Sequence, residues 1–193
     1  MEIHTCYICK NGADSFMTFG QMPIANGFLS EDQFKSEYFF EMEVAFCGQC
    51  NMFQLVNQPG PDQMFNEKYA FFSGTSKLMA KHFEEFANHV LDDYIKDEND
   101  PFVVEIGSND GIMLKYFAQK RIRHLGIEPS ANVAKVAMNL GINTIVEFFD
   151  KSLAEEIVNE HGQADAYIAA NVMCHIPYIN SIVEGIQVLL KPD

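Results

Sequence analysis

Basic residues are scarce in this 193-residue chain, where 13 Lys and Arg face 27 Asp and Glu and leave a formal net charge of −14. Nucleic acids and anionic membrane surfaces attract proteins through clustered positive charge, so we expect neither as a partner. An anionic small molecule stays possible, because helix N-termini and a few local cations can bind phosphate.

Long apolar runs are also missing. No stretch approaches the roughly 20 apolar residues that a membrane span needs. The first residues, Met1-Glu2-Ile3-His4, lack the basic and apolar segments of a signal peptide. We therefore expect a cytoplasmic protein. Thiols stay reduced in the cytoplasm, so clustered cysteines there are more often metal ligands than disulfide partners.

Four of the five cysteines form two Cys-x-x-Cys pairs, Cys6 with Cys9 and Cys47 with Cys50. Four thiolates at this spacing can surround one tetrahedral ion. Zinc is the usual ion in such a structural site, although iron can occupy the same ligands. Neither pair lies at a strand-to-helix junction, where a redox pair would be expected, and cysteines unrelated to metal are the alternative. The spacing predicts a structural Zn²⁺ site.

The chain divides into two regions that differ in their pattern of apolar residues, glycine and proline. In residues 1–66, glycines and prolines interrupt short apolar runs, which predicts a small, loop-rich domain that a metal ion stabilises. Residues 67–193 begin with a predicted helix over 76–93. Its expected apolar stripe consists of Leu78, Met79, His82, Phe83, Phe86, Val90 and Leu91.

Four apolar segments that alternate with helical patterns follow this helix. We predict strands at 102–106, 124–128, 143–146 and 165–170, and helices at 110–119, 130–140, 151–161 and 179–190. Continuous apolar strands that alternate with helices indicate a parallel sheet covered on both faces. The predicted fold class is therefore α/β.

A glycine loop connects the first of these strands to its helix. Such a turn lets a ligand approach the backbone, and the helix that follows offers free amides. Glu128 ends the second strand, where an acidic residue can accept both ribose hydroxyls of an adenosine cofactor. The dinucleotide pattern Gly-x-Gly-x-x-Gly fails, because Asn109 and Ile112 stand at its second and third glycine positions. An ordinary tight turn is the alternative to a cofactor loop.

Three segments carry a family resemblance: Glu105-Ile106-Gly107-Ser108-Asn109-Asp110-Gly111, Gly126-Ile127-Glu128-Pro129-Ser130, and Ala170-Asn171-Val172-Met173-Cys174-His175-Ile176-Pro177. Together they resemble the S-adenosylmethionine-dependent sugar C-methyltransferases, which have an N-terminal four-cysteine zinc module. The resemblance implies a class I methyltransferase (Rossmann-like) sheet. It also implies methyl transfer to a ring carbon, usually C3, of a nucleotide-diphosphate 4-keto-deoxysugar in deoxysugar biosynthesis.

The resemblance assigns the site residues one by one. Those expected to bind S-adenosyl-L-methionine are Glu105, Gly107, Asn109 and Gly111 in the loop, Glu128 at the ribose, Phe149 at the adenine, and Asn171 near the methionine end. The expected catalytic residues are Tyr69, near the substrate, and His175, as the general base. From the residues alone, His175 lies at the carboxyl edge of the sheet, where open α/β sheets bind ligands. A loop histidine that packs against Pro177 is the alternative.

The family's fold continues beyond the point matched by residue 193, with a Tyr-x-Glu-His segment and a C-terminal domain. We therefore expect a partial sheet of order 3-2-1-4, zinc and cofactor binding without turnover, and self-association through the open edge at 165–170. Two other functions stay open: a zinc-stabilised binding or assembly module without activity, and a methyltransferase with a non-sugar substrate.

Overall fold

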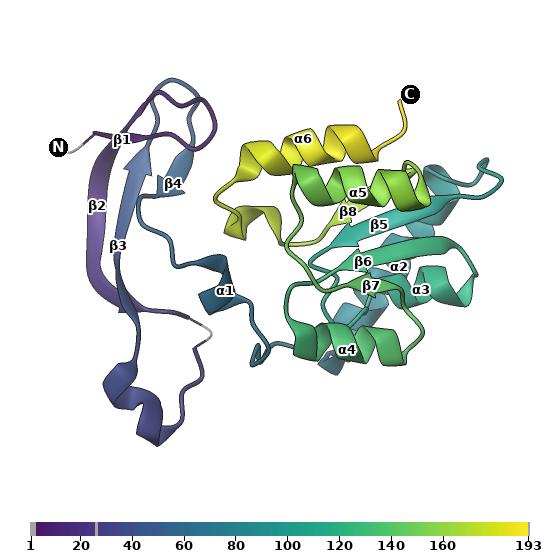
Figure 1. Cartoon of the computed structure of the whole chain (residues 1–193), viewed down its shortest axis with the longest axis horizontal. Coiled ribbons are helices and arrows are strands. Elements are labelled where there is room, and N and C mark those ends of the chain that lie inside the picture. The colour runs from purple at the N-terminus through teal and green to yellow at the C-terminus, as the bar shows by residue number, and fades with distance from the viewer. Residues whose placement is uncertain (1–2, 26, 193) are drawn as a thin grey trace. The chain divides into compact units, whose positions relative to one another are not determined.

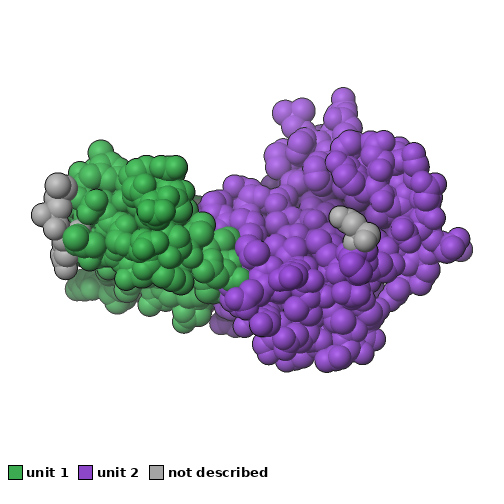
Figure 2. Space-filling view, turned by 90° about the horizontal axis from the view of Figure 1, so that it is seen from above, with its two compact units in different colours: residues 1–64, 176–180 green, residues 65–175, 181–193 purple. Residues whose placement is uncertain are grey.

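The protein is described by a computed structural model that covers residues 3–25 and 27–192. It forms two compact units, which Figure 2 colours separately. The N-terminal unit comprises Met1–Met64 with Ile176–Asn180, and the α/β unit comprises Phe65–His175 with Ser181–Asp193. No helix within the described residues has the length and apolar character to cross a membrane.

A four-stranded antiparallel sheet forms the N-terminal unit. Its strands follow the order of the chain: β1 (Ile3–Thr5), β2 (Gly12–Pro23), β3 (Phe39–Phe46) and β4 (Phe53–Leu55). A 3₁₀ helix η1 (Glu31–Ser36) lies between β2 and β3, and the short helix α1 (Pro61–Met64) follows β4. The sequence analysis expects a loop-rich segment and misses these strands.

Strand β2 is hard to predict from its sequence because its pairing with β3 is irregular. Its pairing with β3 shifts register between Ser15 and Met17 and again between Thr18 and Gln21. Each irregularity resets the inward and outward alternation by which a strand is recognised in a sequence. Ala13 is the only fully buried residue of β2, so its burial pattern does not alternate either.

The α/β unit contains the predicted parallel sheet. Its strands are β5 (Phe102–Ile106), β6 (Arg123–Ile127), β7 (Thr144–Ile145) and β8 (Ala166–Ala169), in the order β7-β6-β5-β8. This order is the expected 3-2-1-4, and all three pairings are parallel. The α/β fold class is thus confirmed. β8 is an edge strand, and beside its start Leu190 pairs with Ala164 in a single parallel bridge.

Helices cover both faces of this sheet (Figure 1). One face carries α2 (Lys77–Asp93), α3 (Leu114–Gln119) and α4 (Ala131–Asn139), and the other carries α5 (Lys151–His161) and α6 (Ile179–Leu189). Two 3₁₀ turns, η2 (Ser73–Thr75) and η3 (Met173–His175), complete the described elements. A continuous core joins α2, α3 and α4 to the sheet through Val90, Phe117, Ala137 and Val103.

Two helix predictions need correction. The apolar stripe of α2 is wrong in part, because Leu78, Met79 and Phe86 are 82%, 40% and 40% exposed, and only Ala87 and Val90 are buried. Helix α3 begins at Leu114 rather than at residue 110, since Gly111 has a φ of +77°, outside the helical region.

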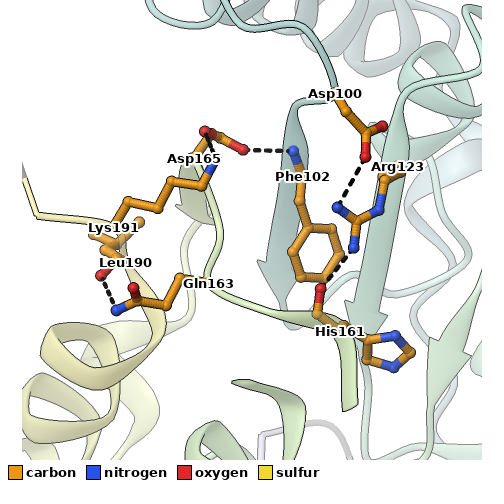
Figure 3. A network of polar contacts seen from close by, with 8 residues as sticks. All are labelled: Asp100, Phe102, Arg123, His161, Gln163, Asp165, Leu190 and Lys191. Atoms are coloured by element: carbon orange, nitrogen blue, oxygen red, sulfur yellow. Dashed lines mark hydrogen bonds and ion pairs between the residues drawn. The ribbon is translucent and has the colours of Figure 1, made fainter. Parts of the chain in front are cut away.

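A polar network fixes the amino ends of the strands (Figure 3). The Asp165 side chain is 4% exposed, accepts a hydrogen bond from the Phe102 N–H at 2.8 Å, and pairs with Lys191. Arg123 places its guanidinium over the Phe102 ring at 4.9 Å and donates to the His161 carbonyl at 2.6 Å. These contacts fix the amino end of β5, and the glycine loop follows its carboxyl end.

Candidate functional site

The four paired cysteines lie together in the N-terminal unit. Their Sγ atoms are all within 4.8 Å of one another, and the Cys6–Cys50 and Cys9–Cys47 pairs are each 3.5 Å apart. A zinc ion with Zn–S bonds of about 2.3 Å holds its four sulfurs about 3.8 Å apart. The cluster therefore fits one tetrahedral zinc ion.

Two similar turns bring these cysteines together. After the first pair, Lys10 has a φ of 62° and donates its N–H to the Cys6 carbonyl at 3.1 Å. After the second pair, Asn51 has a φ of 61° and donates its N–H to the Cys47 carbonyl at 2.8 Å. The left-handed residue reverses the chain in each turn, so both cysteines of a pair face the same point.

Hydrogen bonds fix the backbone on both sides of Cys6 and shift the pKa of Cys9. The buried Gln54 side chain donates to the Thr5 carbonyl at 3.0 Å and accepts from the Tyr7 N–H at 2.9 Å. Hydrogen bonds from the side chain and the backbone of Asn11 lower the pKa of Cys9 to about 6. At Cys50 a backbone hydrogen bond from Met52 lowers the pKa, but burial and the neighbouring thiols outweigh it and raise the pKa to about 12. Without a metal ion, the cluster thus favours the metal-binding thiolate form at Cys9 and disfavours it at Cys50.

In the α/β unit, the glycine loop connects β5 to α3. Gly107 and Gly111 have backbone φ values of +60° and +77°, which residues other than glycine rarely adopt. A Cβ atom on Gly107 would lie 2.3 Å from Val172, and one on Gly111 would lie 2.2 Å from Ile142. Packing within the protein thus requires both glycines, and their predicted contact with a cofactor stays a prediction.

Glu128 lies beside this loop, directly after β6. Its carboxylate accepts hydrogen bonds from the N–H groups of Asn109 at 3.0 Å and Ser130 at 2.8 Å, and the residue is 4% exposed. Burial raises the pKa of Glu128, although the hydrogen bonds from Ser130 and Asn109 oppose this shift. Each carboxylate oxygen keeps a further lone pair, as an acceptor for ribose hydroxyls requires.

Glu105 on β5 is more deeply buried, at 2% exposure. Burial raises its pKa well above the usual value, and the charges of Glu128 and Asp110 raise it further. Among the described residues, the buried oxygens without a hydrogen-bond partner include Glu105 Oε2, Ser108 Oγ and Asp110 Oδ1. Buried polar atoms without partners are rare in folded proteins, so this end of the sheet can receive a polar ligand.

A row of three rings includes both predicted catalytic residues. The Phe65 ring lies 5.5 Å from the Tyr69 ring and 6.1 Å from the His175 ring, measured between centroids. Burial raises the pKa of Tyr69, and the charge of Glu128 raises it further. Tyr69 is therefore close enough to Glu128 to sense its charge. The sequence analysis missed Phe65, whose one signal was its place four residues before Tyr69.

Both regions of the chain match known families. Residues 6–65 match the family described as "Putative zinc binding domain", and residues 104–193 match the family described as "Methyltransferase domain". The C-methyltransferase NovU of Streptomyces niveus is 31% identical to the chain over 195 residues. The chain therefore combines a region that matches a zinc-binding domain with a region that matches a methyltransferase domain.

The chain spans about half the length of this relative: the alignment covers 99% of the chain and 46% of NovU. Solved methyltransferases are similar over part of the chain. Magnesium protoporphyrin IX methyltransferase from Synechocystis PCC 6803, with bound SAM, has 17% identity and a TM-score of 0.44, over 58% of this chain and 56% of its own. A SAM-dependent methyltransferase from Anabaena variabilis has 16% identity and a TM-score of 0.42, over 58% and 57%.

In the methyltransferase domain, the loop after β8 packs against the glycine loop. Val172 occupies the space next to Gly107, and its carbonyl accepts the N–H of His175 at 2.9 Å. Asn171 has a φ of 56°, and its side-chain oxygen lies 3.8 Å from the Cys174 sulfur. The structure thus places Asn171 and His175 at the carboxyl edge of the sheet, where the sequence predicted them.

Phe149 lies in the loop between β7 and α5. It is 4% exposed, its ring is 5.8 Å from the Tyr167 ring, and it lies 3.2 Å from the position of a Cβ on Gly185 in α6. The side chain therefore packs beneath α6. The adenine contact of Phe149 stays a prediction, and the neighbouring Phe148 is the more accessible ring at 36% exposure.

Proposed function

We propose that the methyltransferase domain binds S-adenosyl-L-methionine along residues 107–111, with Glu128 accepting hydrogen bonds from the ribose hydroxyls. The observation that supports this most directly is the position of Glu128, buried beside the loop and fixed by two backbone N–H groups. The buried acidic groups Glu105, Asp110 and Glu128 lie around the loop, and a cation bound there would favour their charged forms, so the site suits a sulfonium cation better than a pyrophosphate.

The proposed reaction is transfer of the methyl group to a ring carbon, C3, of a nucleotide-diphosphate 4-keto-deoxysugar. Carbon as the acceptor is supported by the relative NovU, whose name is C-methyltransferase. The sugar rests on the resemblance of the three segments described above. S-adenosylmethionine would supply an electrophilic methyl group, and the residues of this chain would bind it and prepare the substrate carbon.

His175 and Tyr69 are the proposed groups for that preparation. The C4 carbonyl acidifies the hydrogen on C3, so a base within reach can remove it. We assign this proton to His175. The enolate carbon would then form a bond to the methyl carbon as the bond from that carbon to sulfur breaks, and S-adenosylhomocysteine would leave. Tyr69 would donate a hydrogen bond to the enolate oxygen, because a tyrosine hydroxyl is protonated at neutral pH and can act as a donor.

Calorimetry of the zinc-loaded chain with S-adenosylmethionine, S-adenosylhomocysteine and NAD tests the cofactor assignment. Glu128→Gln should weaken binding of S-adenosylmethionine by about 1–3 kcal/mol, or roughly 5- to 150-fold in Kd, because a charged acceptor is lost. Glu156→Gln, on the exposed face of α5, is the matched control and should bind like the parent. Tighter binding of NAD, or no binding to a folded chain, would contradict the proposal.

A further inference from the structure

Residues 69–76, which we term the strap, lie against the glycine loop. The strap begins at Tyr69 and ends at Ser76, the N-cap of α2. The Asn109 side chain holds it at two points: Nδ2 donates to the Phe71 carbonyl at 3.0 Å, and Oδ1 accepts the Ser73 N–H at 3.0 Å. Both ends of this amide are therefore used on the backbone of the strap.

Two further side chains hold the strap. Asp110 accepts the Gly74 N–H at 2.7 Å, and Asn132 in α4 donates to the Tyr69 carbonyl at 2.6 Å. The approach at Gly74 is close, because a Cβ there would lie 2.9 Å from the Asp110 carboxylate oxygen. A side chain at this position would push the strap away from the loop.

Asn109 also connects the strap to Glu128. Its backbone N–H donates to the Glu128 carboxylate at 3.0 Å, while its side chain holds Phe71 and Ser73. Asn109 has a φ of 52°, a conformation that asparagine and glycine tolerate better than most residues. Asparagine is thus the residue that combines this conformation with one donor and one acceptor.

We propose that Asn109 is a positioning residue that couples the cofactor loop to the strap, and thereby sets the position of Tyr69. The loop backbone would contact the cofactor and become more rigid. The hydrogen bonds of the Asn109 side chain would then make the strap more rigid as well. This coupling rests on the proposed cofactor site. The hold of Asn109 on the strap rests only on the contacts described above, so the two can be tested separately.

The variant Asn109→Gly removes the side chain and keeps the backbone conformation. Hydrogen exchange should show the Ser73 and Gly74 amides exchanging about tenfold faster than in the parent chain. Arg121→Gly is the matched control: Arg121 is exposed in the turn after α3 and has a φ of 60°. It should leave the strap unchanged. Exchange of Ser73 and Gly74 at the parent rate in Asn109→Gly would overturn the proposal.

Titration with S-adenosylhomocysteine tests the coupling. In the parent chain, saturation should slow exchange at Ser73 and Gly74. In Asn109→Gly, the ligand is added until the site is saturated, whatever the Kd of the variant, and strap exchange should then stay at the rate of the ligand-free variant. Asn109→Asp keeps the acceptor for the Ser73 N–H and should restore the protection of that amide. Equal slowing in the parent and in Asn109→Gly would exclude the coupling. Failure of the parent to bind the ligand would overturn the proposed cofactor site and the coupling together, while the exchange of the ligand-free chains would still decide whether Asn109 holds the strap.

Discussion

The zinc-binding domain and the methyltransferase domain are stabilised in different ways. The buried cluster of the first consists of Cys6, Ala13, Ala45 and Cys47, of which two are metal-ligand candidates. One buried cluster of the second includes Val103, Leu114, Phe117 and Ile168, together with six other buried residues. Four small side chains bury little apolar surface, so the first domain needs another source of stability.

Phenylalanine illustrates the same difference. In the N-terminal unit, Phe16, Phe19 and Phe53 are 53%, 53% and 61% exposed. In the α/β unit, Phe102 and Phe117 are 3% and 0% exposed. Aromatic content alone therefore does not reveal a core. The position of a residue in its element decides whether its ring contributes to stability.

Removal of the metal should have the largest effect, because it should unfold the zinc-binding domain alone. The variant Cys47→Ser, or a strong chelator, should unfold the strands β1–β4 and spare the methyltransferase domain. Structural zinc sites bind with apparent free energies of about 10–16 kcal/mol, which the small core of this domain cannot replace. Metal analysis should find about one zinc per chain in the parent.

In that experiment, hydrogen exchange should show which segments unfold. Protection should disappear in residues 3–25 and 27–64 and persist in β5 and β6. Cys174→Ser is the control, because Cys174 is exposed and lies outside the four-cysteine cluster. A metal-free chain that keeps the protection of β2 and β3 would show that the sheet is stable without the ion.

The two domains also differ in how far the sequence predicts them. The strands of the methyltransferase domain are continuous apolar runs, so β5 and α5 were predicted to the residue. The strands β2 and β3 were missed, because register shifts and exposed aromatic rings remove the expected alternation. The metal ligands were evident from their spacing, a local signal. Phe65 and Asn132 act through contacts with residues far along the chain, which no local pattern encodes.

Over-packing the glycine loop should affect only the methyltransferase domain. In Gly107→Ala, the new Cβ would clash with Val172 in a strained conformation of φ +60°. We expect a loss of about 2–5 kcal/mol in the free energy of unfolding, from conformational strain and over-packing together. Gly141→Ala is the matched control, with a φ of +80° and no atom within 4 Å of the new Cβ.

Gly141→Ala should therefore cost only the conformational strain, about 1–2 kcal/mol. Urea unfolding, followed by hydrogen exchange in β5 and in β2, separates the two domains. Equal losses in Gly107→Ala and Gly141→Ala would mean that Val172 moves aside at little cost. A loss of protection in β2 would mean that the domains do not unfold independently.

The smallest expected effect concerns the charge of Glu105, which adjusts the stability of the methyltransferase domain without breaking it. Burial, and then the charges of Glu128 and Asp110, raise the pKa of Glu105 in the folded chain. Between the unfolded pKa of about 4.3 and this raised value, the folded chain binds more protons than the unfolded chain. The contribution of Glu105 is therefore fully favourable below the unfolded pKa and is lost as the pH rises toward the folded pKa. Glu105→Gln mimics the protonated form, so it should raise the melting temperature of the ligand-free methyltransferase domain at pH 7, and the gain should shrink as the pH approaches 4. Glu155→Gln, on the exposed face of α5, should show no such trend. A gain that stays constant with pH would mean that the amide stabilises the domain through its hydrogen bonds and that the charge of Glu105 is not the cause.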